Sequence, residues 1–126
     1  NEDWTDFAMA VNGGKEVAFP DNWEGIAPKI MANAMFNGSA VWTYSPDVTP
    51  TNETGWNALA AGCASNSYNN YSNMLKYGFW WSSTEMNSTN AYYRYIYSEY
   101  PDLSVNNCMK DGMGASVRCV RLKTDN

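Results

Sequence analysis

The chain has 126 residues, a mass of 14.1 kDa, a formal net charge of −5 and a mean hydropathy of −0.51. This length allows one domain with a single core, and the scarcity of lysine and arginine argues against a nucleic-acid partner. Histidine is absent, which removes the commonest catalytic base and metal ligand at neutral pH. No apolar run approaches the roughly 18 residues that a membrane-spanning helix needs. We therefore expect no cofactor.

The segment "NEDWTDFAMAVNGG" (residues 1–14) predicts an amphipathic helix. Four apolar residues share the spacing that places them on one helix face: Trp4, Phe7, Ala8 and Val11. Asn1 is the expected N-cap, and Gly13 or Gly14 is expected to end the helix. A shorter helix is predicted in "APKIMANAM" (residues 27–35), with Pro28 in its first turn.

Residues 37–76 contain turn-forming residues and scattered aromatic residues with little periodicity, which predicts a long, ordered, loop-rich middle. We expect Trp42, Trp56 and Leu59 to anchor this region to the core. It also contains the first of three cysteines; the others are Cys108 and Cys119. The first cysteine is Cys63, and no two of the three have the short spacing of a metal-binding pair. The sequence is compatible either with one disulfide and a spare thiol or with three free thiols.

The last third of the chain reads as β-structure. Strands are predicted over residues 77–84, 91–100, 102–107 and 115–123, and "KDGMG" (residues 110–114) carries an Asp-Gly hairpin signal. Helices followed by loops and an antiparallel sheet indicate an α+β fold.

Period-two alternation sorts the residues of the tyrosine-rich strand onto two faces. Tyr92, Arg94 and Ile96 fall on one face, which Ile96 marks as the buried one. Three tyrosines then stand on the opposite, exposed face: Tyr93, Tyr95 and Tyr97. A buried arginine needs a partner, and we expect Glu85 on the neighbouring strand to be the partner of Arg94.

The stretch "YGFWWSSTE" (residues 77–85) raises the question of what two adjacent tryptophans do in a small acidic domain. Neighbouring residues of a strand point to opposite faces of the sheet. We therefore expect one of Trp80 and Trp81 to fill the core between helix and sheet. The other is expected to lie beside the binding face.

"GFWWSSTE", "NAYYRYIY" and "GASVRCVRL", together with "NEDWTDFAMAVNGG" and "TNETGWNALAAG", resemble the Fibrobacter succinogenes major paralogous domain. The resemblance covers nearly the whole chain and implies a C-type-lectin-like fold, similar to that of the variable proteins of diversity-generating retroelements. It implies one or two N-terminal helices, a loop-rich middle and a C-terminal antiparallel sheet, in a single domain over residues 1–126. Family members usually begin with a strand resembling "GWRVPT", which is missing here, and Cys63 stands where the family more often has a Gly-Tyr-Arg run.

The resemblance also implies an extracellular or bacterial cell-surface location, within a longer surface protein. Without the first strand, "SVRCVR" (residues 116–121) would be an open sheet edge. We expect a neighbouring chain or domain, or a strand from elsewhere in this chain, to cover it.

A row of tyrosines with amide and acidic neighbours resembles a paratope, because tyrosine gives rigid contact area and asparagine gives adaptable hydrogen bonds. The leading hypothesis is a non-enzymatic adhesion module that binds a polysaccharide or a protein. Its predicted ligand-binding residues are Asn87, Asn90, Tyr93, Tyr95, Tyr97, Glu99 and Asn107. The alternative is a solvated sheet face in a structural or terminal domain of a surface protein or filament that has no ligand of its own.

The sequence bears on two further functions, calcium binding and catalysis. A calcium site would draw on Glu85, Glu99 and Asp102 with nearby asparagines, but no lectin-type calcium motif is present and we expect no metal. The resemblance extends at the level of fold to formylglycine-generating enzymes, in which Cys108 and Cys119 would be a reactive pair. A structural disulfide or two buried thiols is the favoured interpretation, and we expect no catalysis.

Overall fold

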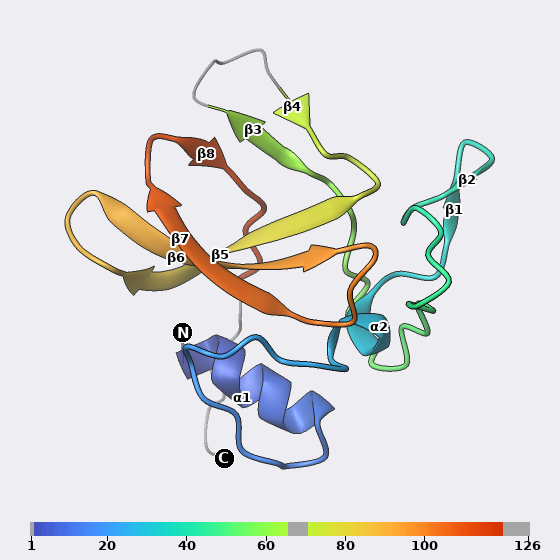
Figure 1. Ribbon diagram of the computed structural model, residues 1–126, viewed down its shortest axis with the longest axis horizontal. Coiled ribbons are helices and arrows are strands. Elements are labelled where there is room, and N and C mark those ends of the chain that lie inside the picture. The colour runs from blue at the N-terminus through green and yellow to red at the C-terminus, as the bar shows by residue number, and fades with distance from the viewer. Residues whose placement is uncertain (1, 66–70, 120–126) are drawn as a thin grey trace.

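The computed structural model describes residues 2–65 and 71–119 (Figure 1). These residues form a helix, one further helical turn and short antiparallel sheets, which confirms the predicted α+β class. The helices are α1 (Glu2–Val11) and α2 (Ala27–Ile30). The strands are β1 (Met35–Phe36), β2 (Ser39–Ala40), β3 (Cys63–Ser65), β4 (Tyr71–Ser72), β5 (Tyr77–Glu85), β6 (Asn90–Tyr97), β7 (Ser104–Met109) and β8 (Met113–Gly114). Neither helix has the length and apolar character needed to cross a bilayer.

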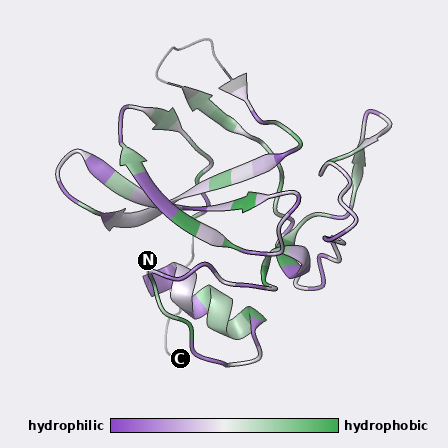
Figure 2. Cartoon of the chain, viewed as in Figure 1, coloured by the Kyte–Doolittle hydropathy of each residue, from purple (hydrophilic) through white to green (hydrophobic). Residues whose placement is uncertain are grey.

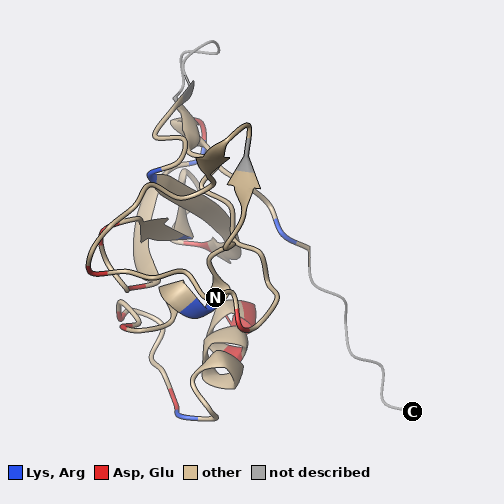
Figure 3. Cartoon of the chain, turned by 90° about the vertical axis from the view of Figure 1, so that its right-hand side faces the viewer, with Lys and Arg blue, Asp and Glu red and all other residues tan. Residues whose placement is uncertain are grey.

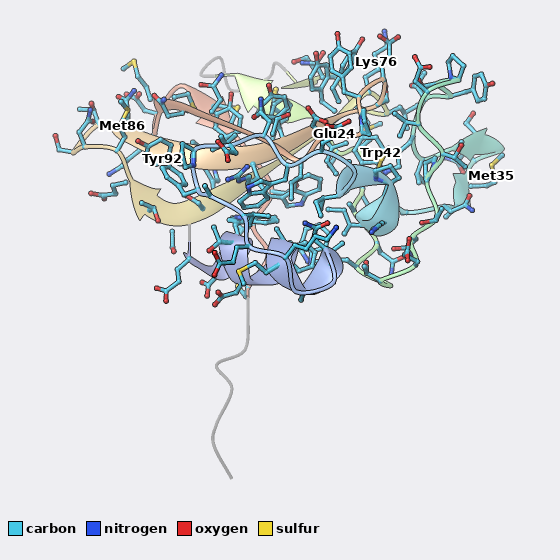
Figure 4. The ribbon with its side chains drawn as sticks, turned by 60° about the horizontal axis from the view of Figure 1, so that its bottom comes forward. Glu24, Met35, Trp42, Lys76, Met86 and Tyr92 are labelled. Atoms are coloured by element: carbon cyan, nitrogen blue, oxygen red, sulfur yellow. The ribbon has the colours of Figure 1, made fainter. Side chains whose placement is uncertain are left out.

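The largest sheet has the strand order β5-β6-β7, and its strand pairs are antiparallel. Helix α1 lies on one side of this sheet, and the small sheet β4-β3-β8 lies on the other side (Figures 1 and 4). The β1-β2 hairpin and the β5–β6 turn project at opposite ends of the molecule, as Met35 and Met86 show in Figure 4. The large sheet is therefore the middle layer.

Helix α1 forms as predicted and packs on the large sheet. Acidic residues occupy its first turn, where they favour the positive end of the helix dipole (Figure 3). Gly13 and Gly14 end it with positive φ angles of 70° and 86°. Trp4 contacts Trp80 with ring centroids 6.5 Å apart. Together with Phe7 and Val11, Trp4 packs on the buried cluster, which confirms the predicted helix face.

The second predicted helix is wrong in its extent, because only residues 27–30 are helical. Met31 is already extended, with φ −66° and ψ 129°, and it forms a parallel bridge with Ala58. After Ile30 the backbone therefore pairs with the segment around Ala58 and does not continue the helix.

The middle of the chain is mostly loop, as predicted. Trp42 is 3% exposed, and its indole N–H donates to the carbonyl of Ala58 at 2.8 Å. Trp56 also packs on the core. The predicted third anchor is wrong: Leu59 is 54% exposed, because its neighbours Ala58 and Ala60 face inward instead.

The C-terminal part departs from the prediction. The turn at the Asp-Gly pair forms, and Gly112 N–H donates to the carbonyl of Met109 at 3.0 Å. However, β8 pairs with β3 and not with β7, so the expected final hairpin is wrong. Of the strand predicted over 115–123, the described part makes an isolated parallel bridge between Ser116 and Trp80. Residues 120–123, and with them the last two residues of the predicted open edge, lie outside the described residues.

The core lies between α1, α2 and the large sheet. Both helices carry hydrophobic positions, drawn green in Figure 2. The core contains a cation: Arg94 is 0% exposed. Its guanidinium donates to the carbonyls of Phe19, Asp21 and Leu103 at 2.6–3.2 Å and stacks on the Trp23 ring at 3.3 Å. Burial lowers the pKa of Arg94 to about 10, with Asp21 opposing that shift.

The predicted partner of Arg94 is wrong. Glu85 instead accepts from Lys110 Nζ at 2.6 Å, at the far end of the sheet. The two terminal nitrogens of Arg94 donate to the backbone of the 19–21 loop, which is distant in sequence and folds over the same sheet face, and to the Leu103 carbonyl. Its Nε is buried and has no hydrogen-bond partner within the described residues.

Candidate functional site

Strands β5 and β6 sort their side chains onto two faces. Trp80 pairs with Arg94 and Gly78 with Ile96 on the core face. The opposite face carries three aromatic pairs: Tyr77 with Tyr97, Phe79 with Tyr95, and Trp81 with Tyr93. We call these six residues the aromatic face. The register confirms the predicted alternation, with Trp80 in the core and Trp81 on the other side.

The rings of the aromatic face touch in an unbroken series. Tyr77 stacks on Tyr97 with centroids 4.6 Å apart, and Phe79 stacks on Tyr95 at 5.9 Å. Trp81 meets Tyr93 edge-on at 6.1 Å. Contacts along the strands link the pairs, such as the one of 5.4 Å between Tyr77 and Phe79. Such pairs stabilise a sheet by up to about 1 kcal/mol each.

The aromatic face is only partly covered. Phe79 is 8% exposed, and the other five residues are half-buried. Tyr100 extends the array beyond Tyr97, with centroids 5.1 Å apart, and is 60% exposed. Half-buried rings held by neighbouring rings present rigid contact area at low entropic cost, which suits recognition.

The two ends of the aromatic face differ electrostatically. Burial, then the nearby Cys108 thiol, raise the pKa of Tyr93 to about 12. At the other end, the Tyr97 hydroxyl donates to Glu99 Oε2 at 2.9 Å, and this bond raises the pKa of Tyr97. Both phenols are therefore neutral hydrogen-bonding groups at physiological pH.

The structure brings only part of the predicted site together. Tyr93, Tyr95, Tyr97 and Glu99 share one surface. Asn107 does not, because it pairs with Tyr92 and lies on the opposite face of the sheet.

The sequence-based site also missed residues that share the aromatic face. Across from β6, Asn106 pairs with Tyr93 and Ser104 pairs with Tyr95. The aromatic residues of β5 were missed too, although alternation along "YGFWWS" places Tyr77 and Phe79 on the side of Trp81. Whether Asn106 or Asn107 lies beside the tyrosines depends on the register between β6 and β7, and no turn motif in the sequence specifies this register.

The two remaining predicted residues hold the β5–β6 turn. Asn87 Oδ1 accepts from the backbone N–H groups of Thr89 and Asn90 at 2.9 and 2.8 Å, and from the Thr89 hydroxyl at 3.0 Å. Asn90 pairs with Met109 at the end of the sheet, away from Tyr95 and Tyr97. Their prediction as ligand-binding residues gains no support from this geometry.

The acidic residues weighed for calcium are not clustered. Glu85 lies at the start of the β5–β6 turn and Glu99 beyond the opposite end of β6. Eight strand residues span roughly 26 Å, so the two carboxylates cannot share an ion. Across residues 2–65 and 71–119, no three His, Cys, Asp or Glu side chains are grouped for a metal ion.

The three cysteines are free. Cys108 is half-buried, and burial, followed by the proximity of Cys63, raises the pKa of its thiol. A raised thiol pKa disfavours the reactive thiolate. Cys119 is exposed. The geometry therefore offers no support for a reactive Cys108–Cys119 pair.

Comparison with known families gives one match. The family model described as Fibrobacter succinogenes major domain matches residues 1–121, nearly the whole chain. A search of curated proteins and a search of solved structures found no match.

Proposed function

The chain belongs to the Fibrobacter succinogenes major domain family, and we propose that it is a non-enzymatic module that binds a polysaccharide or a protein through its aromatic face. We further propose a C-type-lectin-like fold and an extracellular or bacterial cell-surface location. The observation that carries the proposal is the unbroken series of half-buried rings on the sheet face opposite the core.

The arrangement suits binding better than catalysis. The side chains of the aromatic face are rings and phenols, and the pKa of Tyr93 is raised rather than poised near neutrality. Glu99 and Asn106 lie at its margins and supply polar groups. Rigid aromatic area with a polar rim is the composition of a recognition surface.

A glycan and protein array tests the proposal. The wild-type domain is expected to bind a defined subset of targets, with the same pattern when a chelator is added. Tyr95→Ala should abolish or strongly weaken those signals. Tyr44→Ala is the matched control, because Tyr44 is 85% exposed and lies outside the aromatic face.

The alternative is a structural or terminal domain of a surface protein or filament without its own ligand. It predicts no specific array signal, or a signal that Tyr95→Ala and Tyr44→Ala leave equally intact. Either outcome would overturn binding through the aromatic face.

A further inference from the structure

A cavity of about 160 Å³ lies between the first turn of α1, the loop that carries Trp56, the middle of β5 and residues 118–119. It meets the aromatic face only at Trp81. A second hollow of about 300 Å³ shares Trp81, Ser82 and Ser83 with it and continues toward Lys110. The two form a groove that the proposed function does not use.

A β-bulge in β5 lies along this groove. From Trp81 to Glu85, β5 advances four residues, while its partner β6 covers only the two steps from Tyr93 to Ala91. The extra residues of β5 begin at Ser82, whose hydroxyl folds back and donates to the Tyr92 carbonyl at 2.9 Å. Bulges of this kind re-aim side chains and often lie beside functional sites.

Tryptophans form the walls of the cavity. Trp4 and Trp56 meet with ring centroids 5.8 Å apart, and Trp81 lines the cavity from the bulge. All three are half-buried. Within the described residues their indole N–H groups make no hydrogen bond, whereas those of Trp23 and Trp42 donate to backbone carbonyls at 2.9 and 2.8 Å. None of the three indole nitrogens is among the buried, unpartnered atoms of the described residues, so they reach solvent and can donate to a ligand.

The charges around the groove are nearly balanced. The Arg118 guanidinium stacks on Trp56 at 4.0 Å and donates to its carbonyl at 3.1 Å. Lys110 is paired with Glu85. Asp3 and Ser83 are exposed, and neither has a side-chain hydrogen bond or ion pair within the described part of the chain. A cationic ligand would meet Arg118 on Trp56, and an anionic one would meet Asp3. A neutral ligand with many hydroxyl groups suffers neither repulsion.

We propose that this cavity binds a single neutral pyranose unit of a glycan. Its C–H face would stack on an indole ring, because the negative face of the ring attracts positively polarised hydrogens. Its hydroxyls would bond Asp3, Ser83 and the free indole N–H groups. The volume is below the roughly 300 Å³ of pockets that take drug-sized ligands, which fits one ring. The adjoining hollow gives room for the next unit of a chain.

Nuclear magnetic resonance of the ¹⁵N-labelled domain tests this site directly through its indole N–H signals. The probes are methyl glycosides of glucose, galactose, mannose and N-acetylglucosamine, added separately up to ~50 mM, a range that saturates a site even when its Kd is several millimolar, about 3–4 kcal/mol of binding free energy. We expect saturable shifts for Trp4, Trp56 and Trp81 with at least one glycoside. Trp23 and Trp42, whose N–H groups are already bonded, should not shift.

Matched variants assign the effect to the cavity. Asp3→Asn should weaken binding about tenfold or more, because hydrogen bonds to a charged group are the stronger kind. Asp6→Asn, an exposed position on the same helix that does not line the cavity, should leave the Kd unchanged. Tyr95→Ala should also leave it unchanged, so this site and the aromatic face can fail separately. Absence of any saturable shift, equal shifts at Trp23 and Trp42, or equal weakening by both aspartate variants would overturn the proposal.

Discussion

The two faces of the β5–β6 pair are built from alternate residues of the same strands, yet they differ in how deeply their side chains are buried. On the core face, Trp80 is 3% exposed, and Arg94 and Ile96 are 0% exposed. On the aromatic face, tyrosines one residue away stay half-buried. Arg94 is thus more buried than the tyrosines on either side of it, Tyr93 and Tyr95. How deeply a residue of these strands is buried depends on which face of the sheet it lies on, and not on its polarity. The polarity of a buried side chain determines only which hydrogen-bond partners it needs.

The partners make the difference between the faces. Arg94 stays charged at neutral pH, because its lowered pKa is still about 10. Three carbonyls and the Trp23 ring compensate for its lost hydration. The phenol groups of the aromatic face do not need such a set of partners, since they keep access to solvent. One face is therefore committed to stability, and the other keeps rings that solvent can reach.

Removing the buried cation should have the largest effect. Arg94→Met keeps most of the side-chain volume but leaves the Phe19 and Asp21 carbonyls without their donor. We expect a loss of about 3–5 kcal/mol in the free energy of unfolding, measured by urea denaturation. Arg118→Met, at an exposed arginine that also stacks on a tryptophan, should cost less than about 1 kcal/mol. Equal losses in the two variants would remove the distinction between the faces.

The adjacent tryptophans allow a second comparison of the two faces, in which the same substitution is made on each face. Trp80→Ala should cost about 3–5 kcal/mol, because Trp80 packs among Trp4, Trp56 and the core. Trp81→Ala should cost roughly 1–2 kcal/mol, since its ring is half-buried at the sheet edge. Thermal and urea unfolding of both variants measure the difference. A larger loss for Trp81 would mean that the faces are assigned the wrong way round.

The smallest effect concerns the proton on Tyr93. Its pKa rises from 10.0 to about 12 on folding, so the folded state holds more protons than the unfolded state between these values. The contribution of Tyr93 to stability is present below about pH 10 and is lost as the pH rises toward about 12. Relative to Tyr93→Phe, the wild type should therefore lose stability over this interval. Phenolate absorbance should also show one late-titrating tyrosine that the variant lacks, and identical titration curves would contradict this.

How far the sequence predicted the fold depended on the range of the interactions. Residues 4, 7, 8 and 11 and the alternation along β6 are local patterns, and both were correct. Ile96 alone was enough to fix which face of β6 is buried. Two of the three carbonyl partners of Arg94 come from a loop more than 70 residues away, so no local pattern indicated them.

The predicted site failed where it depended on register and pairing. Asn107 was assigned to the tyrosines, yet one residue of register places Asn106 there instead. The pairing of β8 with β3 depends on a contact between distant segments, which an Asp-Gly turn does not determine. The cavity at Trp81 lies along a bulge, and the sequence "WWSSTE" gives no sign of its position.

Tyr95→Ala tests the central claim most directly when stability and affinity are measured on the same preparation. Tyr95 is the middle one of the three β6 tyrosines on the aromatic face and contacts Phe79, Tyr93 and Tyr77. We expect the free energy of unfolding to fall by only about 1 kcal/mol, while binding of a ligand identified on the array loses roughly 2 kcal/mol or more. Tyr44→Ala should change neither quantity appreciably. A large loss of stability with affinity intact would show that the aromatic face serves the fold and not a ligand.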